Sequence, residues 1–236
     1  PFQLTATLPD NYSEYETYAM TFHDTEAQGL KFDSNSVKVY VNDVLIKQGY
    51  TVVTDGLSEG VTFEIRFTDL KATDTALENI LINHDSTIRV EYESVLSDNA
   101  VLGSAGNPNT MYLTYSNNPY GEGTGTTPKD TVIVFTYQTI INKVDGESEP
   151  LDGAEFTLEK KQHDDTWKTI DQEVPTDDHT FTFKGLDDGN YRLKETTTPD
   201  GYNTMEPVYF TIEATHDTES NNPQLTSLSG TSFADP

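Results

Sequence analysis

Val61-Thr62-Phe63-Glu64-Ile65-Arg66-Phe67 alternates apolar and polar side chains along its whole length. A period of two is typical of a β-strand with one face buried and the other in water. The alternation recurs over residues 37–41, 87–92 and 111–117, and a longer strand-forming run covers 131–141. A helical pattern is confined to Ala72–Leu81, with Thr73 as a candidate N-cap. The sequence therefore predicts an all-β fold with one short helix.

The composition excludes several classes of function. The 236 residues include 40 Asp and Glu against 14 Lys and Arg, and the formal net charge of −26 repels nucleic-acid phosphate. The chain has no Cys, which removes disulfides and zinc–thiolate sites. No run approaches the roughly 18–20 apolar residues that a membrane span requires. We expect no nucleic-acid partner, no membrane segment in this chain, and no cofactor or metal.

A domain boundary is expected inside the strand-forming run. Thr131–Tyr137 would complete a first sandwich, and residues 139–144 would begin a second. The resulting units are 1–137 and 138–236, and the second has the size of a single immunoglobulin-like sandwich, about 100 residues. We therefore predict two tandem immunoglobulin-like β-sandwiches.

Ordered motifs mark both units. The second unit contains INKVDG at 141–146, PLDGAEFTL at 150–158, FKGLDDGNY at 183–191 and LKETTTPDGY at 193–202. Over residues 138–214 it resembles the B-type repeat of collagen adhesins (CnaB), a domain of Gram-positive surface proteins and pilins. The first unit contains FHDT at 22–25, GNPN at 106–109 and LTYSNNP at 113–119. It resembles the domain that precedes a CnaB-type unit in sortase-assembled backbone pilins.

This resemblance implies a structural protein and not an enzyme. The chain would be part of a pilus-shaft subunit, displayed outside the cell, anchored to the cell wall and polymerised by sortase. Its partners would be other copies of the pilin and sortase. The alternative is a cell-wall-anchored adhesin that binds a host extracellular-matrix ligand.

In this family the sandwiches are often stapled by a self-formed isopeptide bond between a Lys and an Asn or Asp, assisted by a nearby acid. In the second unit Lys143 shares strand parity with Ile141, and Glu195 shares it with Leu193, so both side chains can face the core. Burial disfavours the ammonium form and leaves a nucleophilic amine. A protonated Glu195 would then hydrogen-bond to the carbonyl under attack.

The acyl partner of Lys143 stays open. It should lie beside Lys143 on the last strand, and we expect it beyond Pro236. Weaker candidates within the chain are Asp217, Asn221 and Asn222.

In the first unit Asn117 is the expected acyl partner, because it alternates with Tyr115 and Leu113 on an apolar face. Asp24 follows Phe22 on one face and is the expected assisting acid. Glu64 is the alternative acid, although Phe63 and Ile65 occupy the apolar face of its strand and leave Glu64 opposite.

The lysine of the first unit is expected upstream of Pro1. Lys38 alternates with Val37 and Val39 and is predicted to face solvent.

Overall fold

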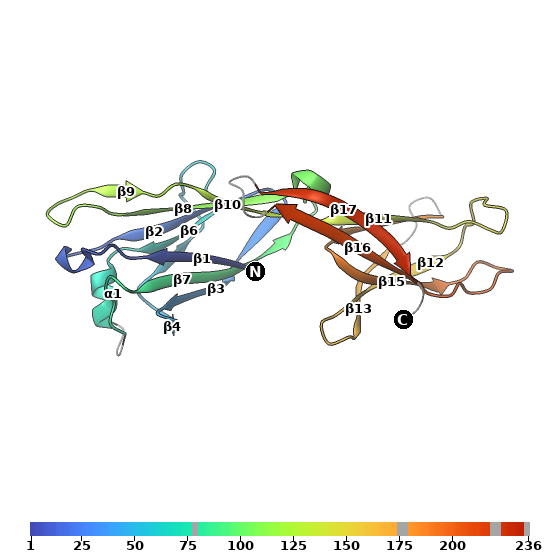
Figure 1. The fold of residues 1–236 in the computed structure, drawn as a ribbon, viewed down its shortest axis with the longest axis horizontal. Coiled ribbons are helices and arrows are strands. Elements are labelled where there is room, and N and C mark those ends of the chain that lie inside the picture. The colour runs from blue at the N-terminus through green and yellow to red at the C-terminus, as the bar shows by residue number, and fades with distance from the viewer. Residues whose placement is uncertain (77–79, 174–178, 218–222, 234–236) are drawn as a thin grey trace. The chain divides into compact units, whose positions relative to one another are not determined.

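The computed structural model describes residues 1–76, 80–173, 179–217 and 223–233. It contains two compact units (Figure 1), the first formed by residues 1–100 and 107–134 and the second by residues 101–106 and 135–236. The second unit thus begins slightly before the boundary drawn from sequence. Tyr137 is 3% exposed and packs in the core of the second unit.

Two antiparallel sheets form the first unit. One has the order β1-β7-β3-β4, and the other has the order β10-β8-β2-β6-β5, with β9 paired to β8. Their inner faces enclose a core that includes Leu4, Phe22, Phe63 and Val90. The strands are β1 (Phe2–Thr7), β2 (Met20–Glu26), β3 (Leu30–Val41), β4 (Val44–Ile46), β5 (Thr51–Val53), β6 (Phe63–Phe67), β7 (Thr87–Leu96), β8 (Asn107–Ser116), β9 (Thr124–Thr126) and β10 (Asp130–Val134), with a 3₁₀ turn η1 at Tyr12–Glu14.

The helix α1 spans Leu70–Ala76, so it begins before the predicted Ala72. Thr73 is not its cap. The Asp69 carboxylate accepts the backbone N–H of Lys71 at 2.9 Å, as an N-cap side chain does. The Thr73 hydroxyl instead donates to the carbonyl oxygens of Asp69 and Gly49. Ile80 and Leu81, predicted to be helical, are irregular.

The second unit is also a sandwich of two antiparallel sheets. A two-stranded sheet has the order β11-β14, and a larger one has the order β13-β12-β15-β16-β17. Phe156, Phe181, Phe183 and Leu193 pack between them. The strands are β11 (Tyr137–Asn142), β12 (Glu155–Lys161), β13 (Trp167–Glu173), β14 (Thr180–Leu186), β15 (Gly189–Thr197), β16 (Val208–Asp217) and β17 (Gln224–Phe233), with a 3₁₀ turn η2 at Gly103–Ala105. The predicted all-β class and tandem sandwiches are confirmed.

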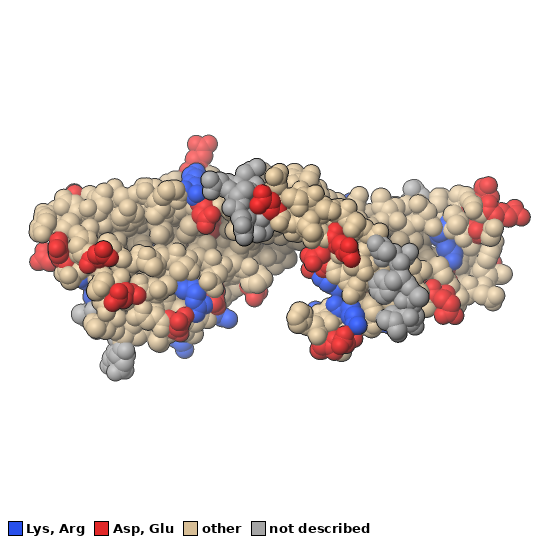
Figure 2. Space-filling model, in the orientation of Figure 1, with Lys and Arg blue, Asp and Glu red and all other residues tan. Residues whose placement is uncertain are grey.

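Acidic side chains outnumber basic ones on the visible face of each unit (Figure 2), as the composition requires. Within the described ranges, no helix is both long enough and apolar enough to cross a membrane. The same ranges hold no cluster of three or more His, Asp or Glu side chains suited to a metal ion.

The aromatic core of the first unit is testable at Phe63. Its ring is fully buried, stacks on Phe32 at 3.8 Å and meets Tyr92 edge-on at 4.8 Å. We expect Phe63→Ala to destabilise this unit by about 3–5 kcal/mol, through lost burial and a cavity. Pulse proteolysis in urea, read from peptides of residues 1–100, measures the change. Leu45→Ala, at a side chain 46% exposed, is the matched control; equal losses in the two variants would contradict the packing described.

Candidate functional site

The second unit brings Lys143 and Glu195 together. Lys143 directly follows β11, where its N–H donates to the His179 carbonyl at 2.8 Å. Its Nζ lies 2.9 Å from Glu195 Oε1; the Lys143 side chain is 12% exposed and that of Glu195 is fully buried. The other carboxylate oxygen of Glu195 accepts the N–H of Met205 at 2.6 Å. An amine and a carboxylate therefore face each other at the edge of an apolar core.

The candidate acyl partner Asp217 lies far from this pair. Leu193 pairs with Val208 at the start of β16, and Asp217 is at the other end of that strand. Nine residues of extended strand span about 30 Å, so Asp217 cannot reach Lys143. Asn221 and Asn222 lie outside the described residues.

A second buried polar group lies in the first unit, around Asp24 on β2. The Tyr92 hydroxyl donates to Asp24 Oδ2 at 2.9 Å, and the Asn109 amide nitrogen donates to the same oxygen at 3.2 Å. Asn109 also contacts the Tyr92 hydroxyl at 2.6 Å. Asp24 is fully buried, and Asn109 is 3% exposed. Asp24, Asn109 and Tyr92 therefore form one buried cluster between the two sheets.

Burial raises the pKa of Asp24 to about 7, an effect that the hydrogen bonds from Tyr92 and Asn109 partly offset. Burial and the nearby Asp24 carboxylate also raise the pKa of the Tyr92 phenol. Two buried oxygens, Asp24 Oδ1 and Asn109 Oδ1, have no hydrogen-bond partner among the described residues. The Asp24 carboxyl can therefore hold a proton near neutral pH, and the cluster can accept a further donor.

Asn117, the expected acyl partner, does not lie with Asp24. Asp24 is paired with Met111 on β8, whereas Asn117 lies beyond the end of that strand and is exposed. Six residues along the strand place Asn117 about 20 Å from Met111. Asn109 is instead the asparagine next to Asp24. It has the same strand parity as Asn117, so parity alone does not distinguish them; the β2–β8 register does.

Glu64, the alternative acid, faces away from the core as expected, yet it is only 3% exposed. It contacts His23 and Arg66 on the other side of its sheet. Lys31 and Lys38 are both exposed. Neither lysine therefore belongs to the Asp24 cluster.

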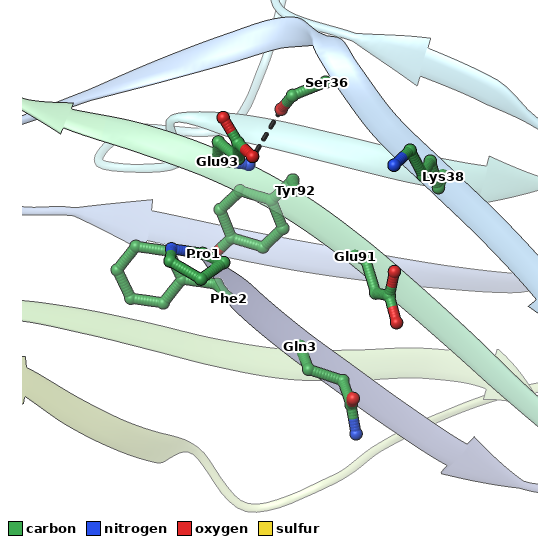
Figure 3. Close-up of a pocket in the computed structure, with 8 residues that line it drawn as sticks. All are labelled: Pro1, Phe2, Gln3, Ser36, Lys38, Glu91, Tyr92 and Glu93. Atoms are coloured by element: carbon green, nitrogen blue, oxygen red, sulfur yellow. Dashed lines mark hydrogen bonds between the residues drawn. The ribbon is translucent and has the colours of Figure 1, made fainter. Parts of the chain in front are cut away.

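The start of β1 borders a surface groove of about 280 Å³. Figure 3 shows Pro1 and Phe2 beside the Tyr92 ring, with Ser36 bonded to the backbone of Glu93 across the groove. The Phe2 and Tyr92 rings stack at 5.2 Å. The Tyr92 hydroxyl donates to Asp24, so the Tyr92 side chain connects this end of β1 to the buried carboxyl.

The second unit matches a known protein family. Residues 138–224 match the family described as the SpaA prealbumin-like fold domain. The trypsin-resistant surface T6 protein of Streptococcus pyogenes serotype M6 is 30% identical over 247 residues, which cover 95% of this chain. The chain is homologous to this surface protein, whose solved structure is described as the T6 backbone pilin of serotype M6. It spans 44% of the length of the T6 protein.

Solved pilin structures share the fold. A C-terminal fragment of the major pilin GBS80 of Streptococcus agalactiae has a TM-score of 0.64 and 25% identity, covering 89% of this chain and 82% of that fragment. Domains D2 and D3 of the major pilin SpaD of Corynebacterium diphtheriae have a TM-score of 0.62 and 22% identity, covering 85% and 78% of the two chains. Both of these structures are described as major pilins.

The raised pKa of Asp24 makes the first unit of this pilin homologue sensitive to pH. Between about pH 4 and pH 7 the folded state holds a proton that the unfolded state releases, so the free energy of unfolding falls as pH rises through this window. We expect a fall on the order of 4 kcal/mol, from about three pKa units, which Asp24→Asn removes. Pulse proteolysis of the first unit at a series of pH values measures it. An unchanged slope in Asp24→Asn, or a slope lost equally in the control Asp98→Asn at an exposed carboxylate, would contradict the assignment.

The Lys143–Glu195 pair is testable through stability. Glu195→Ala leaves an ammonium facing the core without its partner, and we expect a loss of about 3–5 kcal/mol. Urea denaturation followed by the fluorescence of Trp167, in the second unit, reports this loss. Asp165→Ala is the control, because its 2.9 Å pair with Lys161 has a carboxylate 86% exposed and should contribute at most about 1 kcal/mol.

Proposed function

We propose that this chain is a two-domain segment of a pilus-shaft subunit, polymerised by sortase and displayed on a Gram-positive cell surface with cell-wall anchoring. The domains would follow those drawn from the sequence, 1–137 and 138–236, with the second beginning at Phe135 because Tyr137 packs in its core. Homology to backbone pilins supports this proposal. In each domain we propose an isopeptide bond as the element that resists extension.

The contact that best supports the staple is the Lys143–Glu195 pair. A lysine packed against a buried carboxylate at 2.9 Å has a neighbour that can take its ammonium proton and return it to a leaving group. In the proposed step Lys143 Nζ attacks the side-chain carbonyl carbon of an asparagine. A C–N amide bond forms, the asparagine C–N bond breaks, and ammonia leaves with the proton. With Asp217 too distant, we place the acyl partner beyond Pro236.

In the first domain we propose Asp24 as the assisting acid and Asn109, in place of Asn117, as the acyl partner. Asp24 can be protonated near neutral pH, and Asn109 Oδ1 is buried without a partner among the described residues. The reacting lysine would precede Pro1. Inward-facing residues of β1 include Leu4 and Ala6, so the position before Pro1 has inward parity. Continuing the β1–β7 register would put that position opposite Ser94, next to Pro1 and Glu93, which line the groove.

Such a bond suits a pilus fibre because it requires no cysteine and survives reduction. By closing a chain loop it would constrain the unfolded state as a disulfide does, with a stabilisation of about 2–4 kcal/mol. It also joins strands covalently, so that extension of the fibre cannot separate them without breaking an amide.

Intact mass spectrometry of a chain extended at both ends by its native residues tests the staples. We expect the mass to fall by one ammonia for each asparagine-linked bond. Glu195→Ala should prevent the loss of ammonia in the second domain, and Asn109→Ala should prevent it in the first. Both variants should be cleaved faster by trypsin. Asn117→Ala is the matched control and should leave the mass loss intact. A wild-type mass equal to the unlinked sequence would reject the staples, and loss of the bond in Asn117→Ala alone would reject Asn109.

A further inference from the structure

The outward face of the β2–β6–β8 sheet in the first unit carries a polar cluster that the proposed staple does not use. His23 on β2 lies between Glu64 on β6 and Thr114 on β8. Its Nδ1 is 2.9 Å from Glu64 Oε1, and its Nε2 is 2.8 Å from Thr114 Oγ1. The His23 side chain is 12% exposed and that of Glu64 is 4% exposed. A hydroxyl, an imidazole and a carboxylate are thus connected in series.

The carboxylate determines which nitrogen of the neutral imidazole carries the proton. Glu64 in its ionised form only accepts hydrogen bonds, so His23 Nδ1 must be the donor to it. His23 Nε2 then has a free lone pair, and the Thr114 hydroxyl must donate to it. This is the hydrogen-bond order in which a base activates a hydroxyl nucleophile and an acid orients the base.

Neighbouring side chains hold this arrangement in place. The Tyr112 ring stacks on the His23 imidazole with centroids 4.5 Å apart and planes 4° apart. Arg66 Nε contacts the second Glu64 oxygen at 2.5 Å. The imidazole therefore has its plane set by an aromatic neighbour, and the carboxylate is bound at both oxygens.

We propose that Thr114 is an acyl-acceptor site, a hydroxyl that His23 and Glu64 activate toward activated esters. In the step, Thr114 Oγ attacks the ester carbonyl while His23 Nε2 takes the hydroxyl proton. The new Oγ–C bond forms, the bond from the carbonyl to the leaving aryloxide breaks, and His23 returns the proton to the aryloxide. The product is an ester on Thr114, formed without an oxidant or another cofactor.

The expected reaction is stoichiometric acylation in a structural protein, and not turnover. The cluster supplies a nucleophile, a base and an orienting acid, which are parts that general-base catalysis requires. An aryl ester has a leaving group that departs readily, so these three groups are sufficient for it to transfer its acyl group to Thr114. The proposal does not depend on the isopeptide bonds, because it involves none of their residues.

The experiment treats the full chain with p-nitrophenyl acetate at neutral pH and locates acetyl groups by peptide mass spectrometry. Lysine amines also react with this ester, so neutral hydroxylamine is applied afterwards, which removes acetyl from oxygen and leaves it on nitrogen. We expect a hydroxylamine-labile acetyl group on Thr114. His23→Gln should slow its formation by about 100-fold, the lower range of general-base effects, and Thr114→Val should abolish it.

Thr110 is the matched control, since it is on the same strand and face but bonds to the Thr131 hydroxyl at 2.8 Å. In the Thr110→Val variant, Thr114 should become acetylated at the wild-type rate. The proposal is overturned if Thr114 stays unmodified while lysines react, if Thr110 is modified as fast, or if folded His23→Gln reacts at the wild-type rate. If circular dichroism shows His23→Gln to be unfolded, Glu64→Gln replaces it, and an unchanged rate in that folded variant overturns the proposal equally.

Discussion

A carboxyl group placed inside an apolar sandwich must find hydrogen-bond donors, and each unit of this protein is arranged around that requirement. In the second unit the fully buried Glu195 is met by Lys143 Nζ and by the backbone N–H of Met205. In the first unit Asp24 is met by the Tyr92 hydroxyl and the Asn109 amide. In each unit the buried carboxyl thus has a partner within the core, although Asp24 Oδ1 and Asn109 Oδ1 lack a hydrogen-bond partner among the described residues.

The two solutions differ chemically. Glu195 is paired with a cation, so charge balances charge at the edge of the core. Asp24 has neutral partners, and burial raises its pKa to about 7, so a proton can provide the balance instead. One site already holds an amine beside an acid. The other holds an acid beside an amide whose oxygen lacks a described donor, and an amine would complete it. The second unit therefore contains the amine and the acid of the proposed isopeptide chemistry, and the first unit contains the acid and the asparagine.

The period of two also determines what lies on the outside of a sheet. Residues that alternate with the buried Phe22 and Ile65 include His23 and Glu64, which meet on the outward face of the first unit. Glu64 is nearly as buried as a core residue because His23, Arg66 and their neighbours cover it. An outward position in a sheet is thus not necessarily a solvated one. Thr114, His23 and Glu64 lie on three different strands, so no local sequence motif predicts that they meet.

Alternation along each strand was sufficient to predict the all-β class and the inward placement of Lys143, Glu195 and Asp24, because side-chain direction in a strand depends only on local geometry. Parity could not choose between Asn109 and Asn117, which face the same way; the β2–β8 register, set by pairing between distant segments, places Asn109 beside Asp24 and leaves Asn117 beyond the strand end. The N-cap of α1 is Asp69 and not the predicted Thr73, because the helix begins at Leu70, two residues before the predicted start. Local pattern thus determined which way each side chain points, and only the pairing of strands decided which side chains meet.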